Sequence, residues 1–194
     1  KAGAFGKMRS ATFRRLSPSI AGDAWDNWFM DGKRSGGALL DMHLHDTDEV
    51  CYFFGRPKAV TSVGANSIIS NGGTDHVITF YHYDDGTLVE AEGSWAATRG
   101  TPFEMTFQII CEKATIRLMS EGFKIYWNDG RVESPKVEAT TGWHKELAYF
   151  VDCVQNGVTP DKYQTFDSVL DSFKVIMAEQ DSVDANGKRI EIKY

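Results

Sequence analysis

Hydrophobic and polar positions alternate with a period of two through most of the middle of the chain, a pattern that is typical of β-strands. The predicted strands are Lys7–Leu16, Ala59–Ile69, His76–Tyr83, Thr87–Trp95, Phe103–Cys111, Ala114–Met119 and Phe123–Trp127. Successive strands are joined by short connections, and Asp84-Asp85-Gly86 has the composition of a hairpin turn. The stretch from about residue 58 to about residue 133 is therefore predicted to form an antiparallel meander.

Three other segments have helical spacing. Gly36–Phe54 is followed by Gly55 and Pro57, the order expected after the last turn of a helix. Two further helices are predicted at about 143–156 and 166–185, each ending at an Asn-Gly pair. Strands followed by helices predict an α+β fold over residues 1–194, a predominantly antiparallel open sheet with helices packed on one face.

Two segments show neither the alternation of a strand nor the spacing of a helix. Ser17–Ser35 is a long connection with clustered aromatic residues, and loops of this length in a compact domain are often functional or cover a site. Arg189–Tyr194 is predicted to be a short final strand or a tail.

Composition narrows the class of protein. A content of 42% hydrophobic and 12% aromatic residues is that of a folded globular chain, and the net charge of −6 argues against nucleic acid or an anionic membrane as a partner. No apolar run reaches the ~20 residues of a membrane span, and no signal peptide is visible. Cys51, Cys111 and Cys153 are widely spaced and odd in number, which indicates three reduced, buried thiols and a cytoplasmic location.

The first residue is Lys1 rather than a methionine, and a Gly-rich turn and a strand pattern follow at once. We therefore expect that the sequence is taken from the middle of a longer protein.

The helix Gly36–Phe54 carries the densest set of chemically active side chains. With about 100° of rotation per residue, Asp41, His45 and Asp48 fall within about 60° of one another, whereas His43 lies about 160° from His45. A carboxylate one turn from an imidazole holds it in one tautomer and tunes its proton affinity, which suits a general acid or base. The structural alternative is an Asp–His pair that braces the core.

A metal site is the second alternative. The string His43-Leu44-His45 is similar to the His-x-His element of zinc hydrolases, in which two histidines of an extended segment bind one ion. Further ligands would come from His76, His82 or His144.

The same helix resembles that of a known family. The run Gly36–Asp41, with His45 four residues later and then Asp48 and Gly55, resembles the Gly-Gly-rich Asp-xxx-His helix of the Gfo/Idh/MocA oxidoreductases, the relatives of glucose-fructose oxidoreductase and inositol dehydrogenase. The resemblance covers most of the chain. Gly3–Gly6 is similar to the entry to the family's second domain, Cys111–Thr115 to its Glu-Lys hairpin, and Glu146–Gly157 to its penultimate helix.

In that family a Rossmann domain binds NAD or NADP, and the α+β domain that follows supplies the substrate pocket and commonly the subunit interface. The resemblance implies that His45 accepts the proton of a substrate hydroxyl as hydride leaves for the nicotinamide, and that Asp41 orients His45 or joins the proton relay. It also implies three partners: a sugar- or polyol-like substrate, a missing N-terminal Rossmann domain, and a second copy of the chain bound through the open sheet face.

Some positions depart from the family pattern. His43 stands where the family usually has glycine, and Cys111 and Ala114 replace the glycines of the hairpin. No Gly-x-Gly-x-x-Gly follows a strand, and the lysine of the family's Glu-Lys-Pro motif has no counterpart. We therefore expect a folded but catalytically silent fragment that binds no cofactor by itself.

Charged and aromatic residues near the helix suit a polyhydroxylated ligand. The predicted substrate-binding residues are Arg14, Arg15, Trp25, Trp28, Lys33 and Asp48. Three functions follow from the sequence: the substrate and dimerisation domain of an NAD(P)-dependent oxidoreductase, a non-enzymatic binding or assembly module, and a metal-dependent hydrolase that uses His43 and His45.

Overall fold

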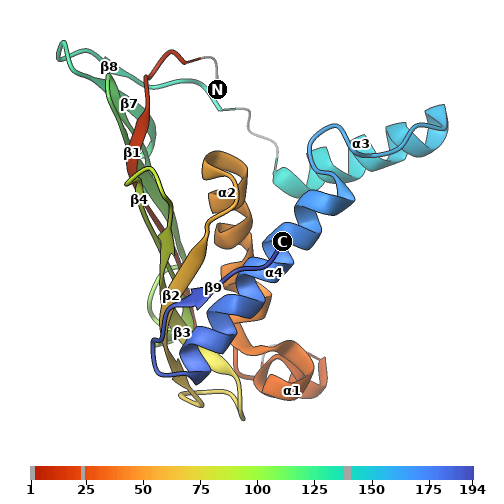
Figure 1. Cartoon of the computed structure of the whole chain (residues 1–194). Helices are drawn as coiled ribbons and strands as arrows, with labels where there is room; N and C mark the ends of the chain where they lie inside the picture. Colours follow the sequence, from red (N-terminus) through yellow and green to blue (C-terminus); the bar gives the residue numbers. More distant parts are fainter. Residues whose placement is uncertain (1–2, 23–24, 138–140) are drawn as a thin grey trace.

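The computed structural model describes residues 3–22, 25–137 and 141–194, and one nine-stranded sheet organises these residues (Figure 1). The strands are β1 (Met8–Pro18), β2 (Ala59–Asn66), β3 (Thr74–His82), β4 (Leu88–Ala97), β5 (Glu104–Cys111), β6 (Ala114–Met119), β7 (Gly122–Trp127), β8 (Val132–Glu133) and β9 (Ile190–Glu191). Each predicted strand is present to within a few residues, because inward and outward positions alternate along it as the sequence does.

The sheet order is β8-β7-β6-β5-β1-β4-β3-β2-β9. The prediction of an uninterrupted meander is wrong at one place, because β1 lies between β4 and β5. β1 runs parallel to β4 and antiparallel to β5, and the remaining pairs are antiparallel. The inward side chains Ala11 and Phe13 of β1 are almost fully buried, which a central position in the sheet provides.

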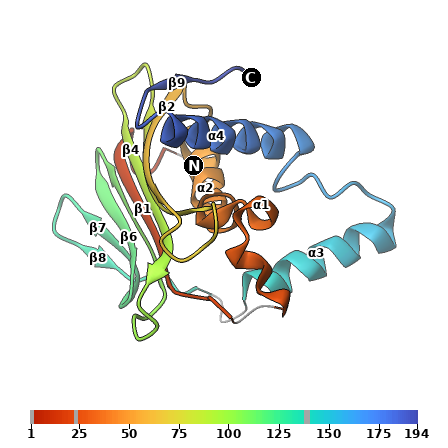
Figure 2. The ribbon, with the colours of Figure 1, turned by 90° about the horizontal axis from the view of Figure 1, so that it is seen from below.

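The helical segments are η1 (Trp25–Met30), α1 (Gly32–Ser35), η2 (Leu39–His43), α2 (Leu44–Phe54), α3 (Gly142–Asn156) and α4 (Phe166–Asp184). α2 and α4 cover one face of the sheet, and the opposite face is open (Figures 1 and 2). The main core lies under these two helices, where Val50 of α2 and Val175 of α4 meet the inward residues of β1 to β5. This arrangement confirms the predicted α+β fold.

α3 differs from the other long helices, because it projects away from the sheet (Figures 1 and 2). Its apolar side chains Leu147, Phe150, Val151 and Val154 are all at least half exposed.

The connection Ser17–Ser35 is more ordered than the sequence predicts. β1 extends to Pro18, and η1 and α1 occupy most of the second half. The three cysteines are free thiols, as predicted, although Cys51 is only half-buried while Cys111 and Cys153 are buried.

The hairpin between β5 and β6 needs no glycine. Cys111 and Ala114 are not among the described residues with positive φ, so the replacement of the two family glycines causes no strain there.

Candidate active site

Two glycines start the helical segment that carries the site. Gly36 and Gly37 both have a φ of 76°, in the left-handed region that favours glycine. A Cβ on Gly37 would lie 2.6 Å from the backbone nitrogen of Thr74. The glycine pair therefore allows the segment to begin in close contact with the start of β3.

The helix is not regular at the residues of interest. Leu39–His43 is π-helical, and an α-helix continues from Leu44. A π-helical turn joins residues five apart rather than four and occurs frequently at functional sites. This segment buries His43 completely and leaves Asp41 and His45 exposed to solvent.

Asp41 and His45 interact electrostatically. Partial burial raises the pKa of the Asp41 carboxyl, and the nearby His45 opposes that rise. A carboxylate of raised proton affinity beside an accessible imidazole is an arrangement that can accept and pass on a proton.

The third acidic residue of the predicted face, Asp48, is engaged elsewhere. Its Oδ1 accepts hydrogen bonds from Gln164 Nε2 and from Ser172 Oγ, both at 2.7 Å. Asp48 therefore ties α2 to α4 and to the segment before it, and the structure does not show it paired with His45.

The two adjacent arginines of β1 point to opposite faces of the sheet. Arg15 is nearly buried on the helix face, where its Nε lies 2.9 Å from Asp46 Oδ2 and its second nitrogen lies 3.2 Å from Oδ1. Arg14 lies on the open face and pairs with Glu92 at 2.8 Å and Glu104 at 3.2 Å. Neither guanidinium is brought to Asp41 and His45.

The remaining predicted substrate residues lie on η1 and α1. Trp25 is 84% exposed, whereas the ring of Trp28 stacks on Phe29 with a centroid distance of 4.2 Å. The Lys33 side chain is exposed, and its backbone nitrogen donates to Asp31 Oδ1 at 3.1 Å, which caps the short helix α1. Trp25 and the side chain of Lys33 are therefore exposed to solvent.

Glu179 is a residue of this region that the sequence analysis missed. It is completely buried, and its Oε2 lies 3.0 Å from Nε2 of His43. Its Oε1 accepts a hydrogen bond from Thr47 at 2.9 Å, and Oε2 accepts one from Thr79 at 3.0 Å. The available signal was its helical spacing from Val175 and Ile176, which places a carboxylate on the buried face of α4.

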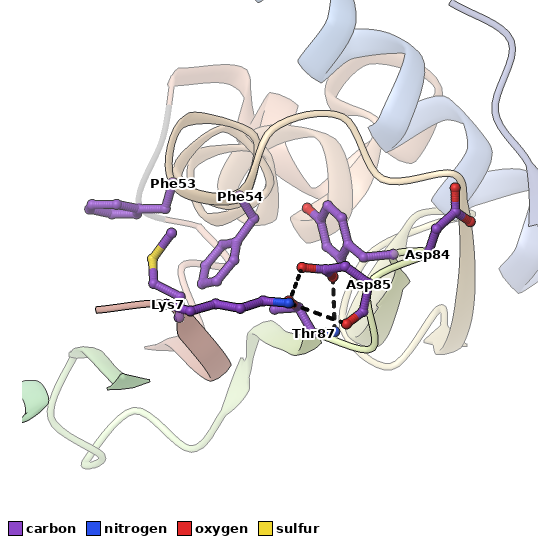
Figure 3. Close-up of a pocket in the computed structure, with 8 residues that line it drawn as sticks. Lys7, Phe53, Phe54, Asp84, Asp85 and Thr87 are labelled. Atoms are coloured by element: carbon purple, nitrogen blue, oxygen red, sulfur yellow. Dashed lines mark hydrogen bonds and ion pairs between the residues drawn. The ribbon is translucent and has the colours of Figure 1, made fainter. Parts of the chain in front are cut away.

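Two pockets lie along α2, and neither is lined by Asp41 or His45. One, of about 320 Å³, lies beside the C-terminal end of α2 and is lined by Phe53 and Phe54, of which Phe54 points toward the Lys7 side chain of the 2.9 Å Lys7–Asp85 ion pair (Figure 3). The other, of about 350 Å³, lies between α2 and the segment before α4 and is lined by Asp48, Tyr52 and Arg56 among others. Asp41 and His45 are exposed to solvent outside these two pockets.

The described residues do not form a metal site, since no group of three His, Cys, Asp or Glu side chains among them could hold an ion. His43 and His45 lie on a helical segment, one buried and one exposed, so the extended His-x-His arrangement of zinc hydrolases is not formed.

The described strands and the turns that follow them differ from those of a dinucleotide-binding site. Dinucleotide-binding folds hold the pyrophosphate on a glycine-rich turn between a parallel strand and a helix. In the part of the chain that the structure describes, the one parallel pair of strands is β1 with β4. β4 is followed by the strand β5, and the connection from β1 to η1 has no Gly-x-Gly-x-x-Gly sequence. Likewise, no helix in these ranges is long and apolar enough to cross a membrane.

A family model described as the GFO/IDH/MocA C-terminal domain matches residues 1–117. The chain belongs to this family. The family resemblance that the Asp-xxx-His helix indicated is thereby confirmed.

Similar proteins share the family's oxidoreductase chemistry. The chain is 28% identical over 144 residues to scyllo-inositol 2-dehydrogenase (NAD(+)) of Bacillus subtilis (strain 168). Its fold is similar to that of levoglucosan dehydrogenase in complex with NADH and levoglucosan, with a TM-score of 0.76 and 19% identity over 99% of this chain. It is also similar to myo-inositol 2-dehydrogenase from Lactobacillus plantarum, with a TM-score of 0.73 and 22% identity over 98% of this chain.

The match spans only part of each relative. The alignment covers 66% of this chain but 40% of the Bacillus subtilis enzyme, and the two structural matches cover 60% and 58% of the solved chains.

Proposed function

We propose that this chain is the substrate-binding and oligomerisation domain of an NAD(P)-dependent oxidoreductase that oxidises a hydroxyl group of a sugar, a polyol or a related compound. The observation that supports this most directly is the accessible Asp41–His45 pair on a π-bulged helix. The family and the inositol and levoglucosan dehydrogenases that resemble the chain favour the same chemistry.

In the proposed reaction, Nδ1 or Nε2 of neutral His45 accepts the proton of the substrate hydroxyl. The imidazolium that forms is stabilised by the negative charge of Asp41 one turn away, and Asp41 can in turn take up the proton. NAD or NADP, held by a cofactor domain outside this chain, would supply the hydride acceptor. The isolated chain is therefore proposed to be inactive.

Trp25 and Lys33 are the proposed substrate contacts, because both are exposed near the start of the helical segment. Trp28 and Asp48 are proposed to support the same region from their packed positions. Arg14 and Arg15 are not proposed as substrate contacts, since both are paired away from His45.

The open sheet face is proposed as the contact between two copies of the chain. Its outward side chains include the apolar Val63, Ile78, Phe80 and Leu88, which are between 38% and 72% exposed. Apolar patches on an open sheet favour association. A cytoplasmic location is also proposed, on the basis of the three free thiols.

Replacement of His45 in the complete protein, as its gene encodes it, tests the acid/base role. His45→Ala is expected to lower kcat about 100-fold or more with the inositols and anhydrosugars as substrates, because positioned acid–base catalysis contributes about 10²–10⁴ in rate. His144→Ala is the matched control, since His144 lies at the exposed start of α3. Unchanged turnover in His45→Ala would refute the assignment.

Two measurements on the isolated chain test the other parts of the proposal. Calorimetry is expected to detect no tight binding of NAD or NADP, and sedimentation is expected to detect a dimer that Phe80→Asp dissociates. Tight nicotinamide binding, or a monomeric wild-type chain, would contradict the respective part.

A further inference from the structure

The buried residue His43 departs from the family's glycine and takes no part in the proposed proton transfer. Its ring is completely buried and lies against β4 at Gly93. A Cβ on Gly93 would lie 2.7 Å from His43 Nδ1 and 2.8 Å from His43 Cβ, closer than side chains approach each other. The His43 imidazole therefore fits against β4 because Gly93 has no side chain.

Glu179 connects this imidazole to three other elements. It faces His43 at 3.0 Å and accepts hydrogen bonds from Thr47 and Thr79, so one carboxylate of α4 contacts η2, α2 and β3. His43 and Thr47 are four residues apart, on adjoining turns of the helical segment. Among the described residues, two other titratable groups lie near this carboxylate: Tyr81, whose hydroxyl lies 3.2 Å from Thr47 Oγ1, and Cys51, which also interacts electrostatically with Glu179.

The contact between His43 and Glu179 depends on how the surrounding elements place the two side chains, because the hydrogen-bonding groups of His43 are not all satisfied. Both ring nitrogens of His43 lack a well-directed hydrogen bond, although Nε2 is within ion-pair distance of the carboxylate. Burial of an imidazole and a carboxylate is unfavourable compared with apolar side chains of the same volume. The pair is therefore expected to have a role beyond packing in the core. Buried polar groups of this kind can select one conformation of the surrounding backbone and side chains among several.

His43 is the last residue of the π-helical turn, and His45 follows two positions later. Asp41 and His45 stand on the solvent side of the segment, and His43 stands on its inner side. We infer that His43 is a positioning residue for His45: its contact with Glu179 and its seat against Gly93 hold the wide turn that sets the Asp41–His45 geometry. This inference rests on the proposed acid/base role of His45.

The experiment compares four variants of the complete protein with the wild type. His43→Ala removes the contact, His43→Gln keeps a nitrogen donor of similar reach, and Glu179→Gln removes the carboxylate charge. Ser62→Ala is the matched control, because Ser62 is completely buried and its hydroxyl lies 2.8 Å from Thr79 Oγ1 without touching η2 or α2.

Turnover and its pH profile are measured with cofactor and an inositol substrate. His43→Ala and Glu179→Gln are expected to lower kcat at least tenfold with less than a threefold change in KM, and to shift the acidic limb of kcat/KM. His43→Gln is expected to recover at least a third of the lost kcat, and Ser62→Ala is expected to leave kcat and the pH profile unchanged. Wild-type kcat and pH profile in folded His43→Ala, or the same kcat loss in Ser62→Ala, would overturn the inference.

Hydrogen exchange on the 194-residue chain separates this inference from the proposed function. Amides from Asp41 to Asp48 are expected to exchange at least tenfold faster in Glu179→Gln than in the wild type, with β3 and β4 unchanged. Unchanged exchange in these amides would refute the anchoring role whatever the activity. An inactive wild-type protein with the expected exchange would instead refute the proposed function.

Discussion

Removal of the carboxylate of Asp46 tests how the helix is fixed to the sheet. Arg15 and Asp46 form a two-bond ion pair of 2.9 and 3.2 Å, and their side chains are only 11% and 3% exposed. Asp46→Ala would leave the Arg15 guanidinium buried, with Glu49 at 4.0 Å as its remaining ion-pair contact. Loss of one partner of a buried pair costs about 3–5 kcal/mol.

The assay is urea unfolding followed by tryptophan fluorescence. With a urea dependence of about 2 kcal/mol per molar, the expected loss lowers the midpoint by about 2 M. The double replacement Arg15→Met with Asp46→Leu is expected to return to within about 1 kcal/mol of the wild type, because an apolar pair avoids the desolvation of both charges.

Arg14 is a control that is adjacent in sequence. Its ion pairs lie on the open face with 46% of the side chain exposed, so Arg14→Ala is expected to cost less than about 1 kcal/mol. If Asp46→Ala and Arg14→Ala lost equal stability, or if the double replacement were as unstable as Asp46→Ala, the account of the buried pair would be refuted.

Two further predictions concern pH. The pKa of Glu49 is raised to about 7 by burial and by the charges of Asp46 and, to a smaller extent, Asp48, while Arg15 opposes this rise. Because the folded state disfavours the ionised carboxylate, stability is expected to fall as pH rises from about 4.5 through 7. Because the side chain is 42% exposed, we expect Glu49→Gln to gain only about 1 kcal/mol at pH 8 and to flatten the pH dependence in urea titrations; no gain at pH 8 would contradict this. For Asp75, burial acts to raise the pKa, but hydrogen bonds from Ser70, Ile69 and Trp95 outweigh it and lower the pKa, so its stabilisation is present above pH about 4 and is lost as pH falls through the folded-state pKa. Asp75→Asn is expected to cost about 2 kcal/mol at pH 7 and less at pH 3 by thermal unfolding, and an equal cost at both values would contradict it.

The sequence predicted the local elements better than their partners. Alternation identifies a strand from its own residues, so β3, β5 and β6 are found close to their predicted bounds. The partners of β1 depend on residues about 80 to 100 positions later, and the pattern of β1 itself does not identify them.

The candidate site was predictable in part. Asp41 and His45 follow from helical spacing and the family resemblance, whereas the π-helical turn changes the spacing too little over five residues to be read from the pattern. Glu179 lies 136 positions after His43, so their contact exists only in the folded chain. The opposite faces of Arg14 and Arg15 were predictable, because neighbouring residues of a strand point to opposite sides.

The central place of β1 bears on the order of events in synthesis. β1 comes before the other strands of this sheet in the chain, yet both of its neighbours, β4 and β5, end about 80 to 100 residues later. Without β1, the strands divide into two groups, β8-β7-β6-β5 and β4-β3-β2-β9, each with a bare edge. Exposed strand edges favour aggregation, and pairings between distant segments form slowly. The chain is therefore expected to be most vulnerable to misassembly between the synthesis of Met8 and that of Cys111, while β1 still lacks β4, β5 or both as partners.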